Sequence, residues 1–146
     1  MIALPDVNVL VALAWPNHVH HERAIRWFED THRSGWATCP VTESGFVRVS
    51  SNRRVVPEAR RPGEAILLLR EITALPGHVF WSDDTSIARS PWIDAERLVG
   101  HGQVTDAHLA ALSLRRKGRL VTFDRAIADV LPKGVEASRV LTVLQP

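Results

Sequence analysis

Four acidic residues stand where the sequence pattern changes from strand-like to helix-like: Asp6, Glu43, Asp106 and Asp124. If the strands run parallel, such junctions lie along one edge of the sheet, so carboxylates far apart in the sequence meet in one pocket. Carboxylates held close together repel one another, whereas a hard divalent cation with oxygen ligands offsets that repulsion. The pattern therefore predicts a magnesium or manganese site.

Each acid taken singly also has a purely structural explanation. Asp6 is a suitable helix cap, Glu43 and Asp106 are favourable near helix N-termini, and Asp124 can order a turn. Random caps, however, would be distributed over both edges of the sheet. Here every one of these acids falls on the side where the strands end, which favours a shared site.

Two polar residues accompany the acids. Asn8, two residues after Asp6, can position a ligand or water, or it can cap a helix. Thr122 faces the same side as Asp124 in an extended strand, so its hydroxyl either supports the site or caps a turn. A divalent cation lowers the pKa of bound water and stabilises charge on phosphoryl oxygens. Phosphodiester cleavage is the reaction that this arrangement serves best.

Strand-like and helix-like segments alternate along the chain. Short apolar runs predict strands at 2–4, 36–39, 78–81, 120–123 and 140–143. Apolar residues at helical spacing predict helices at 7–14, 20–32, 64–73 and 106–117, with a short helix at 126–130. Strands separated by helices imply crossover connections and a parallel sheet covered on both faces. We expect a three-layer α/β/α domain with a central, mostly parallel sheet of four to five strands.

Four local signals refine the expected helix ends. Thr42 and Thr105 are the expected N-caps of the helices that carry Glu43 and Asp106. The run Ser82-Asp83-Asp84 is a natural helix start, and Gly118 suits the position just after the helix 106–117. Pro91 interrupts any long helix in the segment 85–98, which stays unassigned.

Length and composition favour one globular domain over residues 1–146. The chain is 45% hydrophobic and 23% charged, with no low-complexity tract or polar linker. The apolar run 7–15 is too short to span a bilayer. Cys39 is the single cysteine, so an internal disulfide is excluded. These features favour a cytoplasmic protein with no membrane segment.

The basic residues are mostly arginine: sixteen of eighteen, at a formal net charge of +2. Arginine grips phosphate in two places and stacks on bases, so the composition permits nucleic-acid binding. A GC-rich coding bias with solvated helix faces explains the same residues. An exposed Trp15 or Trp27 on the first two helices would be positioned to contact a partner helix.

Several other enzyme classes fit poorly. The chain has no glycine-rich dinucleotide or phosphate loop after a strand, and its seven histidines form no zinc-protease motif. Ser44 lacks the flanking glycines of a nucleophile elbow. Asp6-Val7-Asn8 also lacks the paired aspartates of a haloacid-dehalogenase-like phosphatase.

The segments that carry these acids resemble the PIN-domain family, specifically the VapC-type toxins of bacterial toxin–antitoxin pairs. The likeness rests on the segments 4–10, 104–109 and 120–125, and Glu43 matches the remaining family acid by position. It covers nearly the whole chain, and the stretch around Pro91 matches nothing residue by residue. No acid of the family pattern is missing.

The resemblance implies a magnesium- or manganese-dependent endoribonuclease that is the toxin of a type II toxin–antitoxin system. It implies Asp6 and Asp106 as the main metal ligands, with Glu43 and Asp124 completing the acidic quartet, and products with a 5′-phosphate. It further implies a homodimer and inhibition by a VapB-type antitoxin that covers the groove and places an arginine near the acids.

Two other functions remain open on the sequence. A non-catalytic RNA-binding PIN module would bind RNA without product. A receiver-like magnesium-binding switch would need a lysine near the acids, and only Lys117 and Lys133 exist. Lys117 lies at the far end of its helix from Asp106, roughly 16 Å along the axis at about 1.5 Å per residue.

Overall fold

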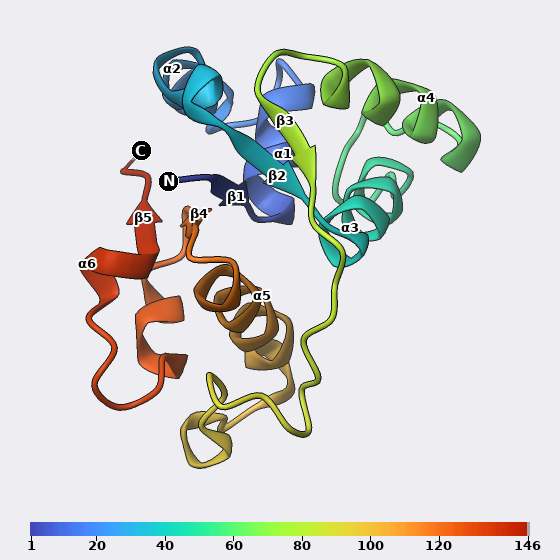
Figure 1. Cartoon of the computed structure of the whole chain (residues 1–146). Helices are drawn as coiled ribbons and strands as arrows, with labels where there is room; N and C mark the ends of the chain where they lie inside the picture. Colours follow the sequence, from blue (N-terminus) through green and yellow to red (C-terminus); the bar gives the residue numbers. More distant parts are fainter. Residues whose placement is uncertain (146) are drawn as a thin grey trace.

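A five-stranded parallel sheet forms the centre of the computed structural model, which describes residues 1–145 (Figure 1). The strand order is β3-β2-β1-β4-β5, and every neighbouring pair is parallel. The strands are β1 (Ala3–Pro5), β2 (Trp36–Thr38), β3 (His78–Phe80), β4 (Arg119–Thr122) and β5 (Leu141–Val143). The predicted α/β fold with a central parallel sheet is confirmed, with five strands.

Helices connect the strands. The α-helices are α1 (Val7–Ala14), α2 (His21–Thr31), α3 (Pro40–Ser50), α4 (Pro62–Thr73), α5 (Val104–Arg115) and α6 (Ala137–Val140). Short 3-10 helices are η1 (His32–Ser34), η2 (Ala95–Arg97), η3 (His101–Gln103) and η4 (Arg125–Val130). None of the helices within residues 1–145 is both long and apolar enough to cross a membrane.

The two faces of the sheet are covered by different helices (Figure 1). On one face, Leu4 and Leu120 pack with Leu109 of α5 in a buried cluster. On the other face, Trp36 of β2 packs with α1, α3 and α4, and Val121 of β4 packs with α1 and α2. Successive residues of a strand point to opposite faces, so short apolar strands supply both cores.

The predicted caps of α3 and α5 are wrong. Cys39 is the N-cap of α3, and Thr42 is its third residue, whose hydroxyl accepts a hydrogen bond from the Cys39 N–H at 3.0 Å. Pro40 suits the first helical position, so α3 begins there rather than after Thr42. Helix α5 begins at Val104, because η3 runs directly into it and makes Gln103 the N-cap.

The expected helix start at Ser82-Asp83-Asp84 is also wrong. Extended chain and turns follow β3 from Ser82 to Asp94. The two aspartates bond instead to side chains of α5, Asp83 to His108 and Asp84 to Arg115. These tertiary contacts hold the segment against α5 and replace the local capping that the sequence suggested.

The turn after α5 differs from the expectation at Gly118. The residue in the left-handed conformation is Lys117, with φ of 53°. Gly118 is needed for another reason: a Cβ atom there would collide with the Trp81 ring and lie 2.7 Å from the Ile2 carbonyl oxygen. The glycine therefore permits close packing of β4 against Trp81.

The expectation of an exposed tryptophan on the first two helices is wrong. Trp15 and Trp27 are 7% and 6% exposed in the isolated chain. The Trp15 indole N–H donates to the Ser50 hydroxyl at 3.0 Å, which satisfies its polar atom inside the core. Both rings stabilise the packing of α1 and α2 rather than offering a contact surface.

Candidate active site

Asp6 is the buried acid of the predicted site. It follows β1, is 6% exposed, and caps α1 by accepting the Val9 N–H on Oδ1 at 3.0 Å. Its Oδ2 accepts the Thr122 hydroxyl at 2.6 Å. Burial and, to a smaller extent, the charge of Asp106 raise the pKa of Asp6 to about 6, against the lowering effect of these hydrogen bonds. Ionised Asp6 is therefore a desolvated negative charge, which a bound cation would stabilise.

Asp106 and Asp124 extend this negative region. Asp106 is half-buried in the first turn of α5, and its pKa is raised by burial and then by the charge of Asp124. Asp124 is exposed and caps η4, where its Oδ1 accepts the Ala126 N–H at 2.8 Å. The three aspartates thus influence one another electrostatically, Asp6 with Asp106 and Asp106 with Asp124.

Thr122 links two of these aspartates. The residue is fully buried at the end of β4. Its hydroxyl oxygen accepts the Asp124 backbone N–H at 3.0 Å while the hydroxyl donates to Asp6. A β-branched side chain fixed at both ends holds the Asp6 carboxylate in one orientation. Asn8 is exposed at the second position of α1, and the helix cap is Asp6, so the capping explanation of Asn8 is wrong.

Glu43 is hydrogen-bonded at the end of β2. Its carboxylate, in the first turn of α3, accepts the Thr38 hydroxyl at 2.5 Å. The Thr38 oxygen also lies 2.8 Å from Nε2 of His78, whose pKa is lowered by burial against the opposing charge of Glu43.

The described residues contain no preformed metal site with three or more ligands. Across residues 1–145, no three His, Cys, Asp or Glu side chains are arranged so that they could hold one ion. The structure brings Asp6, Asp106 and Asp124 close enough for their charges to interact, and Glu43, in the first turn of the helix after β2, bonds to Thr38. Magnesium is commonly held by one or two carboxylates, with waters and substrate phosphates as its other ligands. The donor set of Asp6 and Asp106 fits that mode.

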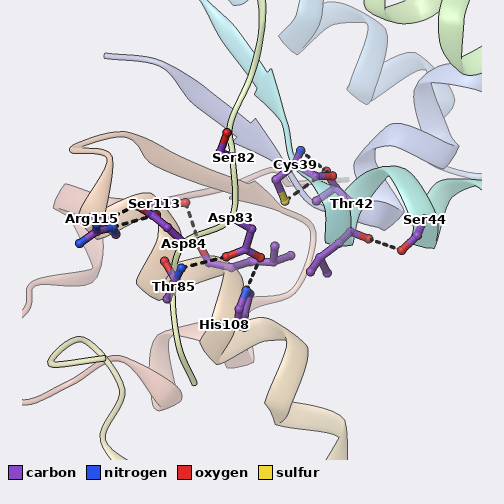
Figure 2. A network of polar contacts seen from close by, with 12 residues as sticks. Cys39, Thr42, Ser44, Ser82, Asp83, Asp84, Thr85, His108, Ser113 and Arg115 are labelled. Atoms are coloured by element: carbon purple, nitrogen blue, oxygen red, sulfur yellow. Dashed lines mark hydrogen bonds and ion pairs between the residues drawn. The ribbon is translucent and has the colours of Figure 1, made fainter. Parts of the chain in front are cut away.

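One pair near the site was missed in the sequence. Asp83 Oδ2 lies 2.5 Å from Nε2 of His108, and the two side chains are 12% and 17% exposed. Figure 2 shows this contact between Asp83 and His108 of α5. Burial raises the pKa of the Cys39 thiol at the start of α3, and the charge of Asp83 raises it as well. Asp83 also lies just after a strand, and that position is what singles out the other acids in the sequence. Its run with Ser82 and Asp84, however, resembles a helix start.

Comparison with known proteins identifies the family. Residues 3–131 match the PIN domain family. The chain belongs to this family. Three PIN-domain relatives come from Mycobacterium tuberculosis. Ribonuclease VapC39 is 51% identical over 92% of this chain and 97% of the relative. Ribonuclease VapC38 is 50% identical over 86% of this chain and 87% of the relative. Ribonuclease VapC44 is 45% identical over 98% of this chain and 100% of the relative.

A solved structure supports the PIN fold. The crystal structure of Mycobacterium tuberculosis VapC20, described as a sarcin–ricin loop cleaving toxin, covers 89% of this chain and 99% of its own. The TM-score is 0.59 at 13% sequence identity. At this identity the likeness concerns the fold alone. The sequence identities of VapC39 and VapC38 place the chain in the VapC group of PIN-domain proteins.

Proposed function

We propose that this PIN-domain protein is a magnesium-dependent endoribonuclease and the toxin of a type II toxin–antitoxin system, acting in the cytoplasm. The observation that carries the proposal is Asp6, a buried carboxylate beside Asp106 with its pKa raised to about 6. The names of the VapC relatives agree with cleavage of RNA. A charge desolvated to this extent, next to a second acid, is unfavourable without a cation.

Asp6 and Asp106 would hold the Mg²⁺ ion, or Mn²⁺ in its place. Both offer only oxygen donors, which these hard cations prefer. Asp124, through its charge on Asp106, adds to the negative potential that attracts the ion. Glu43 would complete the quartet from the side of β2, beyond the bound ion. When bound, the metal supplies charge stabilisation at a phosphoryl oxygen and lowers the pKa of water.

The side chains of this protein would orient the reacting groups. The Val9 N–H and the Thr122 hydroxyl each bond one carboxylate oxygen of Asp6, so the remaining lone pairs of the carboxylate point in fixed directions. The proposed reaction is attack of a water oxygen on phosphorus, with cleavage of the bond from phosphorus to O3′. The leaving O3′ gains a proton, and the products carry a 5′-phosphate and a 3′-hydroxyl. Asn8, exposed beside Asp6, is placed to contact substrate or water.

We propose a homodimer and a VapB-type antitoxin as partners of the protein. Exposed apolar residues support a contact surface outside the core: Ile66 and Leu67 of α4 are 42% and 56% exposed, and Phe80 of β3 is 53% exposed. Large exposed apolar side chains that lie close together mark interaction sites more often than isolated ones do. Co-expression with the antitoxin, followed by sizing of the complex, tests this part.

The decisive experiment compares Asp6→Asn and Asp106→Asn with the wild type on RNA in the presence of Mg²⁺. We expect loss of cleavage in both variants with the fold retained. Asp30→Asn is the matched control, because Asp30 is an exposed acid near the C-terminal end of α2. Mapping of RNA 5′ ends after brief expression would identify the products. Undiminished cleavage by both variants would refute the proposed site.

The same experiment separates the two alternatives. RNA binding without product at any metal concentration would support a non-catalytic RNA-binding module instead. A receiver-like switch is disfavoured by the structure, because Lys117 follows the C-terminal end of α5 and Lys133 follows η4. An acyl-phosphate on an aspartate after incubation with a small phosphodonor would nevertheless support the switch.

A further inference from the structure

A second site lies on the segment that follows β3. Residues 84–86 and 89–92, together with Arg115 of α5, line a pocket of about 180 Å³. The residues that matter for its chemistry are Asp84, Thr85, Arg89, Trp92 and Arg115. None of them belongs to the acidic site described above. The pocket is built by tertiary contacts, because Asp84 bonds to Arg115 across 31 residues of sequence.

Thr85 gives the pocket an unused polar group. The residue is 9% exposed, and its Oγ1 is the one buried side-chain oxygen or nitrogen without a hydrogen-bond partner in the described chain. A buried hydroxyl with no partner is unfavourable, and nearly all such groups in proteins are satisfied by protein, water or ligand. Thr85 lines the pocket, so a polar group bound there is the partner that we expect for this hydroxyl.

Trp92 gives the pocket an exposed aromatic face. It is 39% exposed, whereas the other four tryptophans of the chain are at most 7% exposed. Its backbone N–H donates to the Ser90 hydroxyl at 3.1 Å, which fixes the turn that presents the ring. Exposed aromatic rings beside arginines are the usual stacking platforms for unpaired bases.

The charges around the pocket favour an anion. Arg115 makes two hydrogen bonds to Asp84, at 2.8 and 2.7 Å, and Arg116 lies 3.8 Å from the same carboxylate. Arg115 is the main cause that lowers the pKa of Asp84, so this acid stays ionised and paired (Figure 2). The side chain of Arg89 forms no hydrogen bond or ion pair with any described residue. Among the residues that line the pocket, two arginines and one aspartate leave a net positive charge.

We propose that this pocket binds one unpaired nucleotide of the RNA substrate, with the base stacked on Trp92 and a phosphate near Arg89. The inference rests on the proposed ribonuclease function and adds a contact that selects single-stranded RNA. Arg115 lies nine residues beyond Asp106 on α5, about 14 Å along the axis. That distance corresponds to about four stacked nucleotides at roughly 3.4 Å each. One strand can therefore reach both sites.

The test measures RNA binding apart from turnover. A labelled, unstructured 12-nucleotide RNA is titrated with the full-length protein in chelator, and affinity is followed by fluorescence anisotropy. We expect Trp92→Ala to weaken binding at least about fivefold, as loss of one stacked base does, and Trp92→Phe to stay within about twofold of the wild type. Phe80→Ala is the matched control, because Phe80 is an exposed aromatic residue outside the pocket.

Two further variants test the polar contacts. Arg89→Gln should lower the slope of log affinity against log salt by about one, as loss of one phosphate contact does. Arg33→Gln, an exposed arginine in η1, is its control and should leave the slope unchanged. Thr85→Val keeps the shape of the side chain and removes the hydroxyl, so RNA binding should weaken while thermal stability is retained or rises.

The outcomes separate this inference from the proposed function. Wild-type affinity in Trp92→Ala and Arg89→Gln would overturn the nucleotide pocket, even if Asp6→Asn abolished cleavage. A Trp92-dependent affinity would support the pocket, even if no RNA were cleaved. If Trp92→Ala bound RNA normally but lost binding to the antitoxin, the pocket would be a protein contact, and the inference would be overturned.

Discussion

Two buried threonines at strand ends each donate a hydrogen bond to a carboxylate, and the two carboxylates have different surroundings. Thr122 of β4 donates to Asp6 at 2.6 Å, and Thr38 of β2 donates to Glu43 at 2.5 Å. Both hydroxyl-bearing residues are fully buried. Burial raises the pKa of Asp6 to about 6, and the neighbouring charge of Asp106 adds to that effect. Glu43 is only half-buried and lies close to His78.

Asp6 and Glu43 differ in their surroundings. A hydrogen bond from a threonine favours the ionised carboxylate of Asp6. Desolvation exceeds that effect, because β1 lies at the centre of the sheet and a second acid lies beside Asp6. Glu43 is half-buried after β2 and lies close to His78 of the edge strand β3. The neighbourhood, rather than the pairing with threonine, distinguishes the two.

The largest expected difference is in activity. Asp6→Asn should lower kcat/KM for RNA by about 10³-fold or more, the loss typical of removing a charge-stabilising group. Glu43→Gln should lower it by about 10- to 100-fold, because Glu43 is half-buried and would support the ion rather than hold it directly. Initial rates with a defined RNA measure both. An equal or larger loss in Glu43→Gln would make Glu43 a main ligand.

Replacement of Asp6 by asparagine should raise the free energy of unfolding, although it lowers activity. Its pKa is raised from 3.8 to about 6, so protonated Asp6 contributes stability that is complete below 3.8 and lost as the pH rises through about 6. Without metal at about pH 7.5, the ionised group costs about 3 kcal/mol. Asp6→Asn removes that cost, so urea unfolding in chelator should show a variant more stable by up to about 3 kcal/mol.

The pH dependence is the control for this stability prediction. At about pH 4 the wild type carries a proton on Asp6 for most of the time, and the advantage of Asp6→Asn should nearly vanish. Asp30→Asn should show no such trend, because Asp30 is exposed. A wild type that stayed as stable as Asp6→Asn at about pH 7.5 would mean that Asp6 is not desolvated in solution.

Replacement of Thr122 and of Thr38 should lower activity by smaller factors than replacement of Asp6. Thr122→Val leaves Asp6 without its orienting hydroxyl, and loss of such a supporting contact typically costs about 10- to 100-fold in metal affinity or activity. Thr38→Val should cost only a few-fold, because Glu43 would support the ion rather than hold it directly. Thr122→Ser restores the hydroxyl and should recover most of the activity. A failure of Thr122→Ser to recover would assign the loss to packing instead.

Protection by metal is the smallest expected effect. Free Mg²⁺ at ten times its Kd should stabilise the wild type by about 1.4 kcal/mol. The gain should shrink at about pH 5, because the ion must then displace the proton on Asp6. Thermal unfolding with and without Mg²⁺ measures the shift. Asp6→Asn should lose it and Glu43→Gln should keep most of it, and the reverse pattern would exchange the roles of the two acids.

The sequence was informative where structure depends on neighbouring residues. Helix α1 has the predicted ends, Val7 and Ala14, because apolar spacing and a capping acid are local signals. The segment after β3 was assigned wrongly, because its conformation depends on bonds from Asp83 and Asp84 to residues 25 and 31 positions away. No local pattern reports such partners. Aspartates near a serine therefore resembled a helix start.

By itself, the sequence determined that strands and helices alternate and that acids follow the strands, because periodicity and strand-end chemistry are written in adjacent residues. Tertiary structure alone decided which carboxylates influence one another. The Asp6–Thr122 contact joins residues 116 positions apart, and the Thr38 hydroxyl that bonds Glu43 also contacts His78 of β3. Desolvation of Asp6 likewise depends on packing from distant elements, since the electrostatic environment of a charge is set by everything that excludes water from it.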